Sequence, residues 1–266
     1  MYDYIKLEEI QQTFKEQQKG YNFTQKKLMP IKEILFKIIL VLFNIIFYST
    51  NSTLWAPSMI FTIAKKGNLL LPENWRGIQL SEYFNAWYDR ILGNRIRNWM
   101  AVDEFQTAYQ KNKGCNTQIF TLRIITEFAK IKKKPIYIAY IDLEKAFDKV
   151  RRTTMLDVLI NSGIGATMAN AIKQLYSSTK IFYNSTGQFE TTKGIRQGAS
   201  SSAYIFIIFV NKLFNHLRNS FQPNEISDNI HNLIHADDTI IIDTDKVTFK
   251  EKVIASHKFF SELHQN

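Results

Sequence analysis

The sequence predicts an α+β fold in which a mostly antiparallel sheet is backed by helices. The first observation is a short apolar, β-branched and aromatic run from Ile136 to Ile141, the pattern of a strand buried on both faces. The second is the stretch from Leu233 to Ile242, in which two apolar segments flank an Asp-rich turn and so indicate a β-hairpin. Segments with helical spacing of apolar residues lie before, between and after these strands.

Residues 1–53 are predicted to form a helical N-terminal region. Residues 1–30 are polar and rich in Lys, Gln and Glu, without the charged-then-apolar order of a signal peptide. The stretch from Ile34 to Tyr48 is apolar except for Lys37 and Asn44. A transmembrane helix needs roughly 20 largely uncharged residues, so the pattern favours a buried helix, with membrane contact as the alternative. No membrane partner is expected.

Residues 54–134 are predicted to begin with two strands, Met59–Ile63 and Leu69–Leu71, joined by a Lys-rich turn. The turn and the nearby arginine form either a solvated loop or a grip for phosphate, since Lys and Arg are the usual oxyanion partners. Helices are predicted from Glu82 to Met100 and from Ile119 to Ile131. The polar side of the first helix, which carries Arg90, Arg95 and Arg97, is either a nucleic-acid-backbone-binding face or ordinary surface.

Residues 135–266 contain the two strand segments described first and several further elements. A glycine-bounded loop, Gly194–Ser202, leads into an apolar helix. Its glycines allow a backbone to approach a ligand closely, and Gln197 offers both a donor and an acceptor; the alternative is a plain strand-to-helix connection. The other elements predicted here are helices at 154–163, 166–176, 204–217 and 247–263 and a hairpin at 180–184 and 188–192.

Three carboxylates stand at the ends of the predicted strands. Asp142 directly follows the first strand, where a bare carboxylate at the edge of a core costs several kcal/mol unless it is paired or binds a metal. Asp237 and Asp238 occupy the turn of the predicted hairpin. If the strands are neighbours in one sheet, the three carboxylates can converge on a pair of divalent cations.

The composition of the 266-residue chain indicates a globular protein with a polyanionic partner. The formal net charge is +10, although enrichment in Lys and Asn that reflects an AT-rich genome would also produce it. The single cysteine, Cys115, excludes an internal disulfide and fits a reducing compartment.

Taken together and in order, five segments resemble the reverse transcriptase domain of non-LTR retrotransposons, the LINE-like elements. The resemblance covers roughly residue 50 to the end of the chain. Each motif is weak by itself, and the assignment rests on all five occurring in register. The segments are Lys65–Asn68 with Asn74–Ile78, Glu104–Gln106 through Cys115–Gln118, Asp142–Asp148, Gly194–Gly198 and Ala236–Asp238.

The resemblance implies an RNA-directed DNA polymerase that transfers nucleotides to a primer 3′-hydroxyl with two metal ions about 3.5–4 Å apart. Asp142 and Asp237 would be metal ligands and Asp238 the third catalytic carboxylate. The cation would be Mg²⁺, with Mn²⁺ as an alternative, because hard cations prefer carboxylate oxygens. The implied partners are an RNA template, a DNA primer or target, and deoxynucleoside triphosphates.

The resemblance also assigns residues that would bind the incoming nucleotide. Phe147 would lie beneath the sugar and reject a ribose 2′-hydroxyl, and its alternative is a plain core phenylalanine. Gln197 and Gly198 would line the nucleotide, while Lys66 and Arg76 would hold its triphosphate. The implied architecture is a palm-and-fingers fold, with fingers at 54–134 and an incomplete palm at 135–266.

The chain departs from the family pattern at several positions. His235 replaces the usual Tyr or Phe, Ala203 replaces a proline, and Gln110 and Thr117 replace residues that are commonly Arg and Asp. The chain also ends one helix after the hairpin, which predicts a C-terminally truncated copy that lacks a thumb and is at best a feeble polymerase. The alternatives are a non-catalytic nucleic-acid-binding remnant and a docked helical protein with an incidental Asp-Asp turn.

Overall fold

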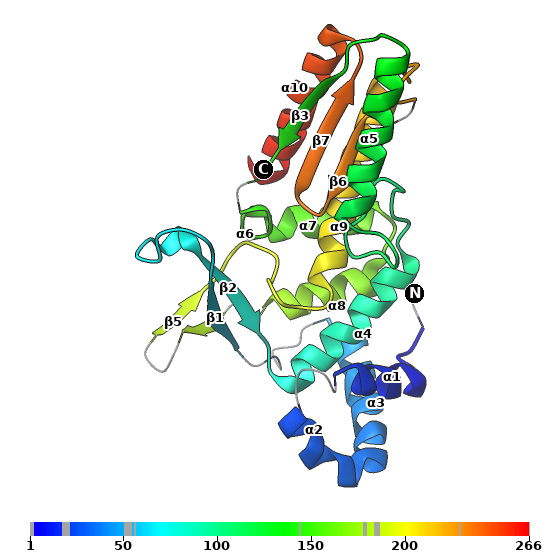
Figure 1. Ribbon diagram of the computed structural model, residues 1–266. Helices are drawn as coiled ribbons and strands as arrows, with labels where there is room; N and C mark the ends of the chain where they lie inside the picture. Colours follow the sequence, from blue (N-terminus) through cyan, green and yellow to red (C-terminus); the bar gives the residue numbers. More distant parts are fainter. Residues whose placement is uncertain are drawn as a thin grey trace. The chain divides into compact units, whose positions relative to one another are not determined.

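The computed structural model describes residues 3–17, 22–50, 55, 57–143, 145–177, 180–183, 187–228 and 230–265 (Figure 1). The chain divides into two compact units. The first comprises residues 1–99 and 156–204, and the second comprises residues 100–155 and 205–266. The chain passes between the units at three points, so this division differs from the linear fingers and palm boundaries expected above. Those boundaries remain a prediction.

The sheet of the first unit has four strands in the order β2-β1-β4-β5. Strand β1 (Ser58–Ala64) pairs antiparallel with β2 (Trp75–Leu80) and parallel with β4 (Lys180–Tyr183), which forms the predicted hairpin with β5 (Gly187–Glu190).

The predicted strand at Leu69–Leu71 is wrong, because these residues form a turn that leads into the short 3₁₀ helix η3 (Pro72–Asn74). The Asn68 side chain accepts a hydrogen bond from the Leu70 amide, which stabilises the turn locally. The partner of β1 therefore begins at Trp75.

Helices of the first unit surround an aromatic core centred on Trp87, which is fully buried. The ring of Trp87 contacts Phe14, Phe36 and Phe43, and its Nε1 donates a hydrogen bond to Thr13 at 2.8 Å. Aromatic pairs of this kind add to the free energy gained from area burial. The helices are α1 (Leu7–Glu16), α2 (Asn22–Leu28), η2 (Met29–Ile31), α3 (Lys32–Tyr48), α4 (Tyr83–Trp99) and α8 (Ala166–Ser177).

The prediction of a buried helix at 34–48 is correct for one face of α3. That face contributes Phe36, Ile39 and Phe43 to the core, whereas Ile38 and Ile45 on the other side are about 60% exposed. Among the residues that the structure describes, no helix is long and apolar enough to cross a membrane.

The sheet of the second unit is antiparallel throughout, with the strand order β3-β7-β6. Strand β3 (Tyr137–Ile141) pairs with β7 (Asp238–Asp243), and β7 forms the predicted hairpin with β6 (Asn232–His235). The two segments identified as strands are therefore neighbours in one sheet. The helices of this unit are α5 (Cys115–Ile131), α6 (Ala146–Lys149) and α10 (Lys246–Gln265), and α7 (Arg152–Asn161) and α9 (Ser202–Ser220) span the division between the units.

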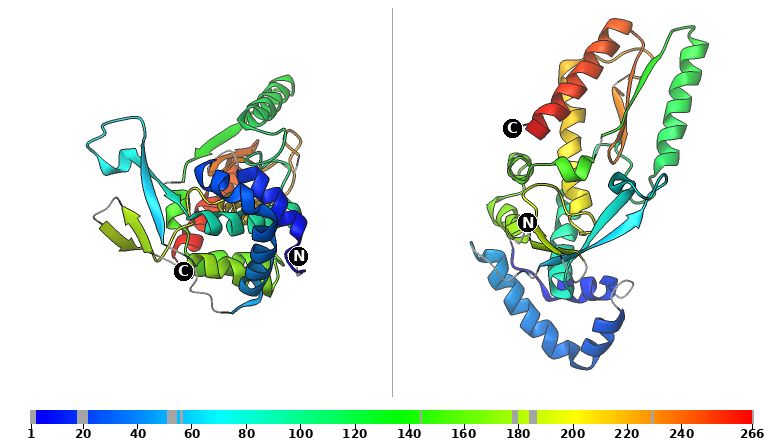
Figure 2. Two further views of the ribbon diagram at one scale, coloured as in Figure 1. Left: turned by 90° about the horizontal axis from the view of Figure 1, so that it is seen from below. Right: turned by 90° about the vertical axis from the view of Figure 1, so that its left-hand side faces the viewer.

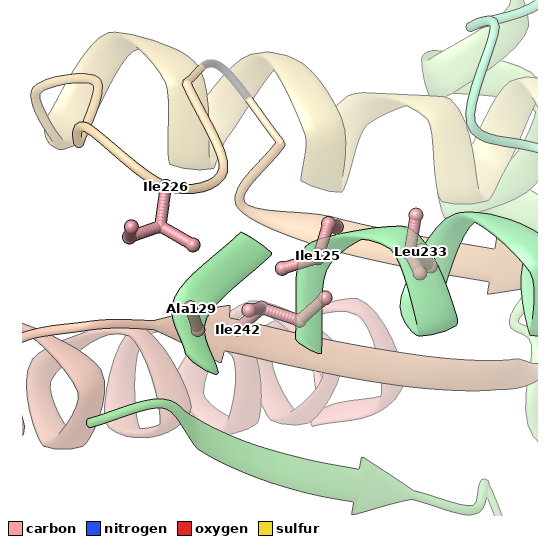
Figure 3. Packing of buried hydrophobic residues seen from close by; sticks show 5 residues of the cluster. All are labelled: Ile125, Ala129, Ile226, Leu233 and Ile242. Atoms are coloured by element: carbon pink, nitrogen blue, oxygen red, sulfur yellow. The ribbon is translucent and has the colours of Figure 1, made fainter. Parts of the chain in front are cut away.

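Helices cover both faces of this sheet, as expected for an antiparallel sheet backed by helices (Figures 1 and 2). On one face, Ile125 and Ala129 of α5 pack with Leu233 and Ile242 in a buried cluster that also contains Ile226 (Figure 3). On the other face, α10 packs against β3 and β7, where the ring of Phe249 contacts that of Tyr137.

The expectation that Ile136–Ile141 is buried on both faces is wrong. Strand β3 is an edge strand of the sheet, and the Tyr140 side chain is 74% exposed. Apolar composition alone does not distinguish an edge strand from a central strand.

Candidate active site

The register of the second sheet places Asp142 across from Asp238. The last pair of β3 and β7 joins Ile141 to Thr239, so the next residues along each strand in that direction are the two aspartates. Residues opposite each other in an antiparallel pair project from the same face. Asp237 directly precedes Asp238 and lies in the two-residue turn between β6 and β7, in which Ala236 adopts a left-handed conformation with φ of +59°. The fold therefore brings Asp142 to the end of the hairpin where the other two carboxylates lie.

Two of the three carboxylates are exposed to solvent, and none of them is fully buried. Asp142 and Asp238 are exposed and Asp237 is half-buried. The expectation that Asp142 needs a partner because it is desolvated is therefore wrong, since Asp142 is exposed.

Carboxylate oxygens are the donors that Mg²⁺ and Mn²⁺ prefer, so the chemistry of these three residues fits a hard divalent cation. In the described part of the chain, however, no group of three or more His, Cys, Asp or Glu side chains lies close enough to hold a metal ion. The three carboxylates thus do not form a preassembled cluster, and their role as ligands remains a prediction.

The turn that carries Asp237 is supported by a segment whose role the sequence did not reveal. The Gln106 side chain is fully buried, and its Oε1 accepts hydrogen bonds from the amides of Ala236, at 3.1 Å, and Ala108, at 3.0 Å. Gln118 of α5 donates to the Ile234 carbonyl at 2.9 Å. Buried amide side chains with these partners hold the hairpin against residues 105–108.

His235 replaces an aromatic residue of the family pattern, and the structure shows how the imidazole is used. Its Nδ1 lies 3.0 Å from the Thr107 hydroxyl, within hydrogen-bonding distance. A phenylalanine at this position would leave that hydroxyl without this partner. The segment at 105–108 is thus bonded to both residues that precede Asp237.

Phe147 lies on α6, shortly after Asp142, and its ring is half-buried. The ring stacks on that of Phe206 from α9, with the centroids 4.3 Å apart and an angle of 19° between the planes. This contact fixes the orientation of the Phe147 ring and leaves part of it accessible. Its role as a sugar gate remains a prediction.

The Gly194–Ser202 loop of the first unit is attached to strand β2. The Gln79 amide donates a hydrogen bond to the Gln197 carbonyl at 2.7 Å. Gly198 has φ of +114°, and a Cβ atom added there would lie 2.8 Å from the Gln79 carbonyl oxygen. A glycine is therefore required at 198 both by its left-handed conformation and by the closeness of β2.

Lys66 and Arg76 belong to the β1–β2 hairpin, and both are exposed. Arg76 pairs with Ile63 near the end of β1, and Lys66 follows in the connecting turn. Apart from Phe147, the residues predicted to contact the nucleotide therefore all belong to the first unit. Two of them lie on this hairpin, and Gln197 and Gly198 lie beside β2.

The arginines of α4 are not a uniform nucleic-acid-binding face. Arg95 forms an ion pair with Glu9 of α1 at 2.7 Å and donates to the carbonyls of Asp3 and Tyr4. Burial acts to raise the pKa of Glu9, but the hydrogen bond and charge of Arg95 lower it overall. Arg95 thus joins two helices, whereas Arg97 is exposed on the surface.

The second unit thus combines a three-stranded antiparallel sheet with helices on its two faces and carboxylates at its hairpin turn. Two solved telomerase structures, each in complex with a fragment of telomeric RNA, resemble the fold of this chain. The structure from Candida albicans has a TM-score of 0.54 and 11% identity over 79% of this chain and 40% of that chain. The structure from Candida tropicalis has a TM-score of 0.54 and 14% identity over 81% of this chain and 40% of that chain.

Residues 63–264 match the family described as reverse transcriptase (RNA-dependent DNA polymerase), and the chain belongs to this family. Relatives include Pol polyproteins of R2 retrotransposable elements. The one from Nasonia vitripennis is 26% identical over 206 residues, 76% of this chain and 20% of the relative. The one from Popillia japonica is 23% identical over 78% of this chain and 30% of the relative.

These matches confirm the resemblance drawn from the five motifs, namely a reverse transcriptase domain of a non-LTR retrotransposon. The chain spans 20–30% of the length of these two relatives.

Proposed function

We propose that the chain catalyses RNA-directed DNA synthesis. In this reaction a primer 3′-hydroxyl loses its proton to solvent and attacks the α-phosphorus of a deoxynucleoside triphosphate, and the bond between the α- and β-phosphates breaks to release pyrophosphate. The observation that carries this proposal is the position of Asp142 across from Asp238, beside Asp237, in a chain of the reverse transcriptase family. Asp142 and Asp237 would hold Mg²⁺ or Mn²⁺ with Asp238 as the third carboxylate. Two such ions supply charge stabilisation to the attacking and leaving oxygens of an in-line displacement.

The residues proposed to hold the incoming nucleotide each have a chemistry that suits this role. Lys66 and Arg76 are exposed cations suited to a triphosphate, since guanidinium and ammonium groups form charge-assisted hydrogen bonds with phosphate oxygens. Gln197 and Gly198 would present side-chain and backbone atoms to the nucleotide. The Phe147 ring, held by Phe206, would exclude a ribose 2′-hydroxyl by collision. Residues 54–134 would then serve as fingers and 135–266 as palm.

The net charge of the chain and its structural similarity to telomerases both support nucleic-acid partners. A net charge of +10 attracts the phosphate backbones of an RNA template and a DNA primer or target. The telomerase structures that share the fold were solved with RNA, which supports an RNA partner here as well.

Primer extension on an RNA template tests the proposal. The purified chain is incubated with primer, deoxynucleotides and Mg²⁺ and compared with Asp142→Asn and Asp237→Asn. Each variant should lose roughly 10²–10³-fold or more in rate, because a neutral amide removes several kcal/mol of charge stabilisation at the cation. Asp157→Asn, on the exposed side of α7, is the matched control and should extend normally.

RNA binding, measured by fluorescence anisotropy in the same preparations, distinguishes a polymerase from a non-catalytic nucleic-acid-binding protein. Binding that fades between about 50 and 200 mM salt, together with extension that depends on both aspartates, supports the polymerase. Binding without extension in the wild-type chain would instead assign it a non-catalytic nucleic-acid-binding function. Absence of both would reject the two functions together.

A further inference from the structure

Asp89 on α4 is a buried carboxylate that accepts hydrogen bonds from one loop of the candidate site. Its side chain is 4% exposed. Its Oδ2 accepts hydrogen bonds from the amides of Ser200, at 2.6 Å, and Ser201, at 3.2 Å, and its Oδ1 accepts one from the Ser201 hydroxyl. A buried carboxylate is costly unless its lone pairs are satisfied, and here one short loop supplies the donors.

The same face of α4 provides a second contact for this loop. Gly93 lies one helical turn after Asp89, and a Cβ atom added there would be 3.1 Å from the carbonyl of Ser200 and the amide of Ser201. The backbone of α4 therefore touches the loop directly, beside the carboxylate. At its other end the loop is bonded to β2, where the Gln79 amide donates to the Gln197 carbonyl. The segment from Gln197 to Ser201 is thus held at both ends.

A buried cation lies in the same loop, directly before Gln197. Arg196 is 5% exposed, and its Cζ lies 5.2 Å from the centroid of the Tyr176 ring. Burial raises the pKa of Asp89, whereas the hydrogen bonds from Ser201 and Ser200 and the positive charge of Arg196 act in the opposite direction. The arrangement places opposite buried charges next to the backbone that presents Gln197 and Gly198.

We propose that Asp89 is a positioning residue for nucleotide binding, which holds the backbone from Gln197 to Ser201 in its bound conformation before a deoxynucleotide arrives. This inference rests on the proposed function, since it assumes that Gln197 and Gly198 line the nucleotide. A loop that is ordered in advance loses less conformational entropy on binding. Because Asp89 reaches the nucleotide only through the loop, it affects the KM for deoxynucleotide rather than the rate of the chemical step.

The test is Asp89→Asn, which keeps the shape of the side chain but replaces one acceptor oxygen with a donor. In primer extension, the KM for deoxynucleotide should rise about tenfold or more, as expected for lost hydrogen bonds to a charged group. The kcat at saturating nucleotide should stay within about twofold. Hydrogen exchange without nucleotide should become faster at the amides of Ser200 and Ser201.

Glu9→Gln is the matched control, because it weakens the ion pair of Arg95 on the same helix without touching the loop. It should lower stability and leave the KM for deoxynucleotide unchanged. If Asp89→Asn fails to fold, Ser201→Ala serves instead: it removes the hydroxyl bond alone and should raise the KM by a smaller factor.

The outcomes separate the inference from the function on which it rests. An active wild-type chain whose KM is the same in Asp89→Asn, or whose KM rises equally in Glu9→Gln, overturns the positioning role and leaves the polymerase intact. A wild-type chain that neither binds nor incorporates deoxynucleotide overturns both. A selective rise in KM with faster exchange at Ser200 and Ser201 establishes the role of Asp89.

Discussion

The ammonium group of Lys252 forms an ion pair with the carboxylate of Asp243, and both side chains are almost completely buried, at 0% and 3% exposure. Lys252 also donates to the Ile242 carbonyl at 3.3 Å, and Asp243 accepts from the amides of Thr244 and Asp245. The pair joins α10 to the end of β7, the strand that begins at Asp238. Burial lowers the pKa of Lys252, and the charge of Asp243 opposes that change.

Replacing Lys252 with Met should destabilise the second unit by about 3–5 kcal/mol, because it leaves the Asp243 carboxylate buried without its cation. Urea unfolding followed by circular dichroism measures the change. Lys250→Met, an exposed position on the same helix, should alter stability by only about 0.5 kcal/mol or less. Equal effects at the two positions would show that the ion pair contributes nothing specific.

Replacing Phe147 with Val should admit ribonucleotides while deoxynucleotide use persists. Removing the ring opens the space under the sugar, and one-methylene differences in a pocket give roughly 10–200-fold discrimination, with a direct clash giving more. The ratio of kcat/KM for deoxy- and ribonucleotides measures this. Phe206→Leu removes the stacking partner and should shift the ratio less. If neither variant changes the ratio while both lower stability, Phe147 is a packing residue.

Replacing Gly198 with Ala should impair deoxynucleotide binding and cost at least about 1–2 kcal/mol, because a side chain at φ of +114° is strained and its Cβ would lie 2.8 Å from Gln79. Thermal unfolding and the KM for deoxynucleotide report the two effects. The control is Gly114→Ala, where a Cβ atom would meet no atom within 4 Å. A Gly198→Ala chain with wild-type stability would contradict the close approach to β2.

Stability should fall as the pH drops from about 6.5 to about 4, in part because of His231. This side chain is 1% exposed, and burial lowers its pKa to about 4, with the charges of Lys252 and Arg218 acting in the same direction and those of Asp243 and Asp228 opposing them. The unfolded chain takes up the proton first, so native stability is lost across this window, by up to about 3 kcal/mol.

Urea unfolding of the wild type and His231→Phe at the two ends of that window isolates the contribution. The variant should show a weaker dependence on pH, because phenylalanine takes up no proton. The substitution breaks no hydrogen bond within the described part of the structure, since both imidazole nitrogens lack a partner there. An unchanged pH dependence would assign the loss to other groups.

Much of the fold follows from patterns that are local in the sequence. The hairpin of β6 and β7 has apolar segments on either side of a two-residue turn, and α4 and α8 have apolar residues at helical spacing, so neighbouring residues alone specify these elements. Five short motifs in register were sufficient to identify the family, because they carry the residue types that the chemistry needs.

Tertiary structure decided which groups are buried and which residues meet. Asp89 and Ser201 are separated by 112 residues, and Gln106 and Ala236 by 130, so no local pattern could reveal their hydrogen bonds. The exposure of Asp142, the edge position of β3 and the parallel pairing of β1 with β4 likewise depend on where distant segments pack. The sequence by itself determined the chemical groups and the local elements that carry them. Only long-range packing determined the supports that hold those groups in place, because the burial of a side chain depends on every segment that surrounds it.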